Sequence, residues 1–179
     1  MNYPNPYIQF LVHFHGDRDY FECHELLEEH WKNTEAAERE SVWVGLIQIA
    51  VSLYHYRREN LQGAKKTINK AISILSIRQS RVEELGLDYQ SLIELLNDIQ
   101  SNIDDKQHYT SVNLPIKESA LLTKCKQVCK EKRLIWCSNS NLSNISLIHR
   151  HKLRDRSEVI NNRKQSLLHK RKSRIENKD

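Results

Sequence analysis

The sequence predicts an all-α protein: a compact antiparallel bundle of about five helices, followed by a basic, partly helical C-terminal extension. Three observations predict this fold class. Apolar residues recur at helical spacing in nearly every segment of the first hundred residues. The chain of 179 residues has only 4 Gly and 3 Pro, too few for the many tight turns of an all-β fold. The connections between the helical segments are short, which favours antiparallel neighbours.

The first two predicted helices lie before residue 33. A short helix follows Pro6 and ends near residues 13–16, where the apolar periodicity stops. Asp17 is a good N-cap for the second helix, because its carboxylate can accept a hydrogen bond from a free backbone N–H of the first turn. This second helix is expected to run to about Lys32.

The third predicted helix begins in the acidic stretch TEAAERE, residues 34–40, because negative charge suits a helix N-terminus. It continues to about Arg58 and is apolar almost all round, as expected of a central buried element. Asn60 can cap a fourth helix over residues 61–75. Gly86 then provides a stop signal for this helical region.

Asp88 can cap the fifth helix, which runs to about residue 105 and completes a helical domain at residues 6–105. We expect this domain to fold without residues 106–179, the basic extension. In that extension, YTSVNLPIK reads as an extended strap, Lys117 to Arg133 as a helix, and Asp155 as the start of a last basic helix.

The charges of the chain are divided unequally between its two parts. Residues 1–119 carry 12 basic and 18 acidic side chains, whereas residues 120–179 carry 16 basic and 5 acidic ones. The basic part can dock on the acidic body, or it can bind nucleic acid nonspecifically through the phosphates. Aromatic stacking residues are scarce in it and it contains no known nucleic-acid-binding motif, so docking is the favoured alternative.

The sequence contains no stretch of about 20 apolar residues that would span a membrane, and its N-terminus lacks a signal-peptide pattern. We therefore expect a cytoplasmic protein that does not bind membranes. Cys125, Cys129 and Cys137 lie close together in the sequence, but C-x3-C is not diagnostic of zinc. The favoured interpretation is that these cysteines are reduced thiols on a helix.

A polar cluster in the second helix, within YFECHELLEEHWK, is the main candidate site. Its spacing matches none of H-E-x-x-H, H-x-x-E-H or the E-x-x-H pairs of di-iron bundles. At about 100° per residue, however, His24 and Glu28 share one face of the helix with Trp31. On the third helix Gln48 and His55 share a polar stripe, and the preceding antiparallel helix is the expected neighbour of that stripe.

Three interpretations of this polar cluster remain open: a solvated stripe, a structural hydrogen-bond network, and a metal or catalytic site. In the third, His24, Glu28 and His55 are candidate ligands of Zn²⁺ or Mn²⁺ and leave a position open for water. Glu28 and His24 are the candidate catalytic residues even without a metal, as a general base and its orienting partner. Glu25, Gln48 and Trp31 complete the predicted polar site.

Two blocks, YFECHELLEEHWK and GLIQIAVSLYHYRRENLQGA, resemble the signature of DUF309, a family of small all-α bacterial proteins. The matching motifs are H-E-x-x-E-x-x-W from His24, G-L-I-Q from Gly45 and N-x-x-G-A from Asn60, and the resemblance covers residues from about 8 to 105. It implies a compact helical bundle. The family is named for its unknown function, and some members carry the label of metal-dependent hydrolase, which agrees with candidate ligands at positions 24, 28 and 55.

Three classes of function therefore follow from the sequence. The first is a small hydrolase-like enzyme with its site between the second and third helices. The second is a non-enzymatic helical interaction module, which would take a protein partner or form a homo-oligomer. The third is electrostatic binding of nucleic acid by the basic extension.

Overall fold

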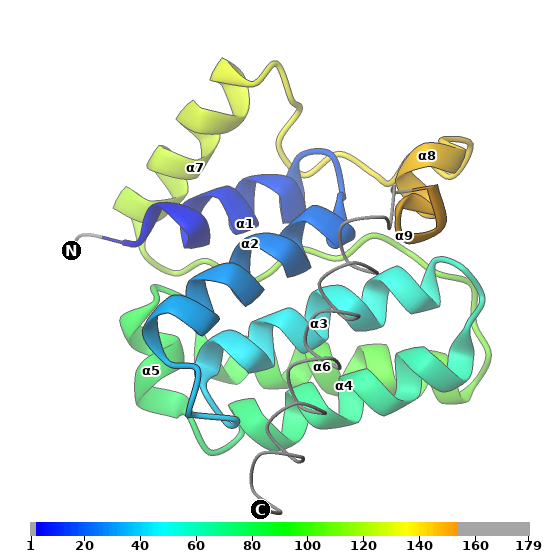
Figure 1. Cartoon of the computed structure of the whole chain (residues 1–179), viewed down its shortest axis with the longest axis horizontal. Helices are drawn as coiled ribbons and strands as arrows, with labels where there is room; N and C mark the ends of the chain where they lie inside the picture. Colours follow the sequence, from blue (N-terminus) through cyan, green and yellow to red (C-terminus); the bar gives the residue numbers. More distant parts are fainter. Residues whose placement is uncertain (1–2, 154–179) are drawn as a thin grey trace, which may run out of the picture. The chain divides into compact units, whose positions relative to one another are not determined.

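The computed structural model describes residues 3–153, and it confirms the all-α fold (Figure 1). Leu87 and Ile116 form an isolated β-bridge, and otherwise the regular elements of these residues are helices. In chain order they are α1 (Asn5–His15), α2 (Tyr20–Thr34), α3 (Val42–Tyr56), α4 (Leu61–Leu75), α5 (Gln79–Glu84), α6 (Tyr89–Asp104), α7 (Ser119–Glu131), α8 (Ile145–Ile148) and α9 (Arg150–Leu153).

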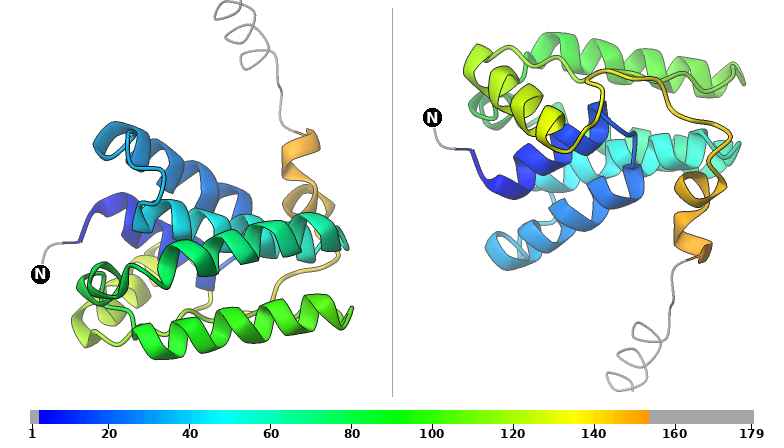
Figure 2. Two further views of the ribbon diagram at one scale, coloured as in Figure 1. Left: turned by 90° about the horizontal axis from the view of Figure 1, so that it is seen from below. Right: turned by 90° about the horizontal axis from the view of Figure 1, so that it is seen from above.

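The chain divides into two compact units, Met1–Ile148 and His149–Asp179. In the first unit, α3 packs between α2 and α4, while α1 packs on α2 and on α7. Helix α6 packs on α4, and the two lie side by side in the views of Figure 2. None of the described helices is both long and apolar enough to cross a membrane.

Helix α3 is the central buried element that its apolar sequence predicts. Of its 15 residues, all but Gln48, Val51 and His55 are buried. Because α3 contacts both α2 and α4, its polar side chains can meet either neighbour. The rotation of this helix therefore decides which residues can share a site.

Five of the described helices are capped at their starts by side chains, two of them at the predicted residues. Gly63 N–H donates to Asn60 Oδ1 at 3.1 Å, and Ser91 N–H donates to Asp88 Oδ1 at 2.8 Å, as the sequence indicates. Helix α2 starts two residues later than predicted, because Asp19 rather than Asp17 accepts the N–H of Glu22. The acidic stretch at residues 34–40 was predicted to start α3, and this is wrong.

Ser41 caps α3 instead, since its hydroxyl accepts the N–H of Trp43 at 3.2 Å. Except for Thr34, the last residue of α2, the acidic stretch lies between α2 and α3, and it is exposed apart from half-buried Glu35. The apolar periodicity begins only at Val42, and that periodicity, rather than the negative charge, sets the start of the helix.

The region that ends at Gly86 contains two helices, α4 and the short α5. Gly86 has a φ of 75°, the left-handed conformation that glycine adopts without strain. A Cβ at this position would also lie 2.7 Å from the Tyr3 hydroxyl. The predicted stop at Gly86 is therefore confirmed, and Asp88 starts α6 two residues later.

The predicted strap is extended and packs back against the helices. Asp88 N–H donates to the carbonyl of Pro115 at 2.8 Å, and Lys117 N–H donates to the carbonyl of Gly86 at 2.8 Å. Helix α7 follows it close to the predicted bounds. The last basic helix predicted from Asp155 lies outside the described residues, so nucleic-acid binding by that segment stays a prediction.

Candidate functional site

Helix α2 presents the predicted polar cluster at its surface because its other side is anchored in the core. Tyr20 and Leu27 are completely buried. The side chains of His24, Glu25 and Glu28 lie at the solvent-accessible edge of the helix and are 28%, 32% and 34% exposed. The cluster is therefore partly accessible to solvent.

The three side chains of this cluster are within reach of one another. His24 Nδ1 lies 3.4 Å from Glu25 Oε1, and His24 Nε2 lies 3.4 Å from Glu28 Oε2. One nitrogen of His24 and one oxygen of each glutamate all lie within 4.8 Å of one another. Among the described residues, this is the one group of three or more His, Cys, Asp or Glu side chains arranged closely enough to hold a metal ion. Glu28 also pairs with Lys32, whose Nζ lies 3.0 Å from Oε1.

Trp31 closes the loop after α2 rather than joining the His24 group. Its indole N–H donates to the carbonyl of Glu38 at 3.0 Å. Gln48, on α3, is half-buried. The other predicted partner, Glu25, does belong to the group, so α2 contributes all three of its members.

The structure does not bring His55 together with His24 and Glu28. The Nδ1 of His55 lies 2.9 Å from the side-chain Nδ2 of Asn60, and the His55 ring lies close to Gly63 at the start of α4. Tyr54, one residue earlier, is the residue that meets α2, with its ring 6.1 Å from that of Phe21. A step of about 100° along the helix turns His55 away from α2.

Ser52, three residues before His55 on α3, also faces α4. The Ser52 hydroxyl is buried and donates to the carbonyl of Ala64 at 2.9 Å. Burial, with a smaller contribution from the charge of Arg58, lowers the pKa of His55. A neutral His55 fits a packing role at the α3–α4 contact.

Sequence reasoning missed two buried arginines, Arg18 and Arg57, which are 1% and 6% exposed. Arg18 donates to the carbonyls of Phe14, Val112 and Ser138 and to the side-chain oxygen of Asn113. These bonds join the turn before α2 to the strap and to the segment after α7. Arg18 lies between two aspartates, and no sequence pattern distinguishes a buried arginine in such a setting from an arginine exposed to solvent.

Arg57 lies at the end of α3 and its guanidinium lies 4.9 Å from the centre of the Tyr20 ring. It donates to the Arg18 carbonyl and the Ser140 hydroxyl, both at 2.8 Å, and to the Leu147 carbonyl at 3.3 Å. Its Nε is buried without a hydrogen-bond partner. The apolar run of α3 was the sequence signal that could have predicted the burial of Arg57. A basic residue that directly follows such a run continues a buried helix.

Two of the three clustered cysteines are packing residues of α7. Cys125 and Cys129 are buried in α7, Cys137 is exposed, and all three are free thiols. Burial, with a contribution from Cys129, raises the pKa of Cys125 to about 12, which keeps this thiol protonated. This chemistry agrees with the reduced-thiol interpretation and disfavours a thiolate ligand at Cys125.

Comparison with known proteins gives one family and one relative. Residues 7–67 match the model of the domain of unknown function DUF309. The chain is 46% identical over 172 residues to the uncharacterized protein YpuF of Bacillus subtilis (strain 168), and the match covers 96% of this chain and 99% of the relative. No solved structure matches the chain. Both blocks that carry the resemblance lie within the matched residues, and the helical fold agrees with it; the chain belongs to the DUF309 family.

Proposed function

We propose that the protein binds a divalent transition-metal ion, Zn²⁺ or Mn²⁺, at His24, Glu25 and Glu28. One observation carries the proposal: a ring nitrogen and two carboxylate oxygens from one helix lie within 4.8 Å of one another. Imidazole and carboxylate are donors that both metals accept. His55, the third candidate from the sequence, is replaced in this set by Glu25.

The distances support this choice. Metal–ligand bonds of about 2.0–2.2 Å place the ligand atoms of a tetrahedral site roughly 3.4 Å apart. His24 Nδ1 lies 3.4 Å from an oxygen of Glu25, and His24 Nε2 lies 3.4 Å from an oxygen of Glu28. Since one ion takes only one ring nitrogen, small rotations of these partly exposed side chains complete the set.

Three protein ligands on an open surface leave coordination positions for water or a substrate. A bound Zn²⁺ lowers the pKa of its water to about 7, which is the chemistry of metal-dependent hydrolysis. In the alternative without a metal, Glu28 would act as the general base and His24 as its orienting partner. The exposed setting favours a substrate that binds from solvent along α2.

The experiment is metal analysis of protein purified without a histidine tag, followed by titration of the metal-free protein with Zn²⁺ and Mn²⁺. His24→Ala and Glu28→Ala should each lower the affinity at least tenfold, because each removes one of three ligands. Glu29→Ala is the matched control, since Glu29 is exposed on the same helix and lies outside the group. Lys32→Ala should retain the metal, because it removes only the cation that pairs with Glu28.

Equal affinities for the Glu28 and Glu29 variants would remove the metal site and favour a second candidate, a non-enzymatic helical interaction module. Its supporting observation is that His24 already pairs with its own helix, while His55 packs against Asn60 and Gly63. A purely structural role predicts no metal affinity in any variant and stabilities within about 1 kcal/mol of one another.

A further inference from the structure

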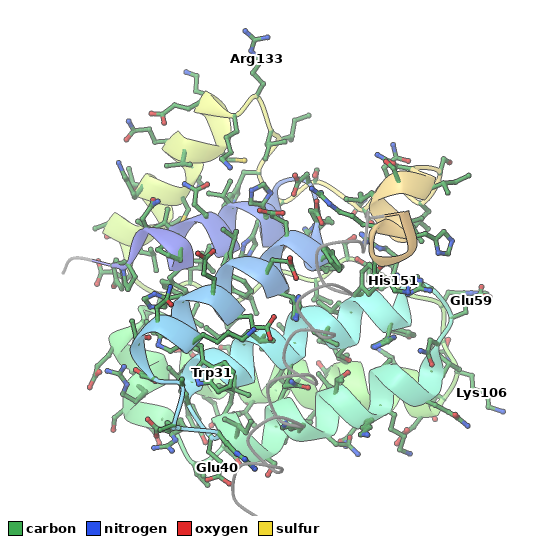
Figure 3. The ribbon with its side chains drawn as sticks, viewed as in Figure 1. Trp31, Glu40, Glu59, Lys106, Arg133 and His151 are labelled. Carbon is green, nitrogen blue, oxygen red and sulfur yellow. The ribbon has the colours of Figure 1, made fainter. Side chains whose placement is uncertain are left out.

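A pocket of about 390 Å³ lies where the turn between α3 and α4 meets the first residues of the strap. Figure 3 shows two residues of its rim, Glu59 and Lys106, at the same end of the helices. Its lining includes Tyr56, Arg57, Leu61, Lys106, Tyr109 and Leu142. Its volume lies in the range of about 300–1,000 Å³ that is usual for sites of small organic ligands.

The charge of Arg57 is the first reason to assign a ligand to this pocket. Each of its hydrogen bonds reaches a neutral acceptor, and its Nε has none. Burial lowers the pKa of Arg57, which expresses the cost of keeping a guanidinium charged away from water. Buried charges in proteins are normally paired with an opposite charge, and among the described residues no carboxylate is hydrogen-bonded to this guanidinium.

Arg18 provides the internal comparison. It is equally buried, but its Nε and both terminal nitrogens donate hydrogen bonds. It also lies outside the lining of the pocket, whereas Arg57 belongs to it. Of these two arginines, Arg57 is the one that has the unused donor and that borders the pocket.

Two tyrosines and two leucines give the pocket aromatic and apolar surface beside its polar residues, and the tyrosines are held in place. The rings of Tyr56 and Tyr109 meet edge to face with their centres 5.8 Å apart. The Tyr56 hydroxyl donates to the carbonyl of Gln107 at 2.8 Å, and the Tyr109 hydroxyl lies 2.7 Å from that of Tyr20. Leu61 and Leu142 add apolar surface. Such walls suit a flat, ring-bearing ligand.

We propose that this pocket binds a small organic anion, a phosphate or carboxylate attached to a planar ring. Arg57 and Lys106 supply the positive charge, and Tyr56 and Tyr109 supply the surface for the ring. Glu59 is the one acidic residue of the lining and is exposed at the rim. The pocket shares no residue with the His24 group, so the two proposals stand or fall separately.

The test is calorimetric titration of the full chain with adenosine 5′-monophosphate and with benzoate. Adenosine and inorganic phosphate are the comparison probes, because each lacks one half of the proposed ligand. At least one ring-bearing anion should bind, and adenosine and phosphate should each bind at least tenfold more weakly than it does. Failure of both ring-bearing anions to bind at millimolar concentration overturns the proposal, and phosphate binding as tightly overturns the role of the ring.

Two pairs of variants locate the binding without disturbing the buried Arg57. Lys106→Glu should weaken binding at least tenfold, and Lys70→Glu, the same charge change on an exposed residue of α4, should not. Leu142→Glu should repel the anion, whereas Ile145→Glu, at an equally exposed apolar residue outside the lining, should not. Equal losses within either pair would mean general electrostatic attraction and would overturn the assignment to this pocket.

Discussion

At the scale of single residues, His15 shows how a titratable side chain becomes part of the core. It is 1% exposed, its Nδ1–H donates to the carbonyl of Leu11 at 2.8 Å, and its Nε2 accepts the N–H of Leu114 at 3.0 Å. Its ring stacks on Trp136 with the centres 4.5 Å apart. Only the neutral ring can accept at Nε2, and burial, helped by the charge of Arg18, lowers the pKa of His15 to about 4.

This pKa predicts a loss of stability in mild acid. Because the folded pKa lies below the ordinary value of 6.5, the stabilisation is complete above pH 6.5 and is lost as the pH falls toward 4. The loss should approach about 3 kcal/mol, from roughly 1.4 kcal/mol per pKa unit. Urea unfolding of the parent protein and of His15→Gln between pH 7 and 4 measures it. If the two proteins lose stability in parallel, His15 is not the titrating group.

At the scale of elements, the contact between α3 and α4 accounts for the second sequence block. Gly45 lies against Leu75, the Ser52 hydroxyl bonds to the carbonyl of Ala64, and His55 lies beside Gly63. Small residues at these positions let the two helices approach closely. His55, which the sequence offered as a metal ligand, thus belongs to a line of packing contacts along α4.

Gly45→Ala tests this close approach. A Cβ at this position would lie 2.5 Å from a methyl carbon of Leu75, which is fully buried and has little room to move. Overpacking of this kind costs about 1–3 kcal/mol, which should exceed the roughly 1 kcal/mol that alanine gains over glycine in a helix. Gly63→Ala is the comparison, since its neighbours Asn60 and His55 are partly exposed and can shift.

The denaturant midpoint should therefore fall for Gly45→Ala and change less for Gly63→Ala. A Gly45→Ala protein as stable as the parent would show that α3 and α4 have space to separate, and the packing interpretation of the second block would be wrong.

At the scale of the whole molecule, residues beyond the predicted boundary at Asp105 complete the first compact unit. Arg18 bonds to residues 112, 113 and 138, and His15 accepts from residue 114. Leu114 and Leu121 are buried in the same core as α1. Whether residues 6–105 fold alone stays a prediction, but these contacts indicate that the strap and α7 stabilise them.

Two truncations measure this contribution. A chain that ends at Ile148 should unfold at the same denaturant concentration as the full chain, because the first compact unit is intact. A chain that ends at Asp105 should stay helical but lose at least about 3 kcal/mol, since burial of Leu114 and Leu121 contributes roughly 1.5–3 kcal/mol each. Circular dichroism during urea unfolding compares the three proteins. Equal urea midpoints for all three proteins would show that the strap and α7 do not stabilise residues 6–105.

The sequence by itself determined what depends on local spacing. Helical periodicity predicted the all-α fold, the caps at Asn60 and Asp88 follow from one side chain and the turn after it, and His24 and Glu28 meet because they are four residues apart on one helix. Only the tertiary structure decided what depends on how helices rotate against one another. His55 faces α4 because α3 has neighbours on two sides, and Arg57 borders a pocket whose walls are distant in the sequence. No local pattern records such a juxtaposition, because it is set by the packing of the whole core.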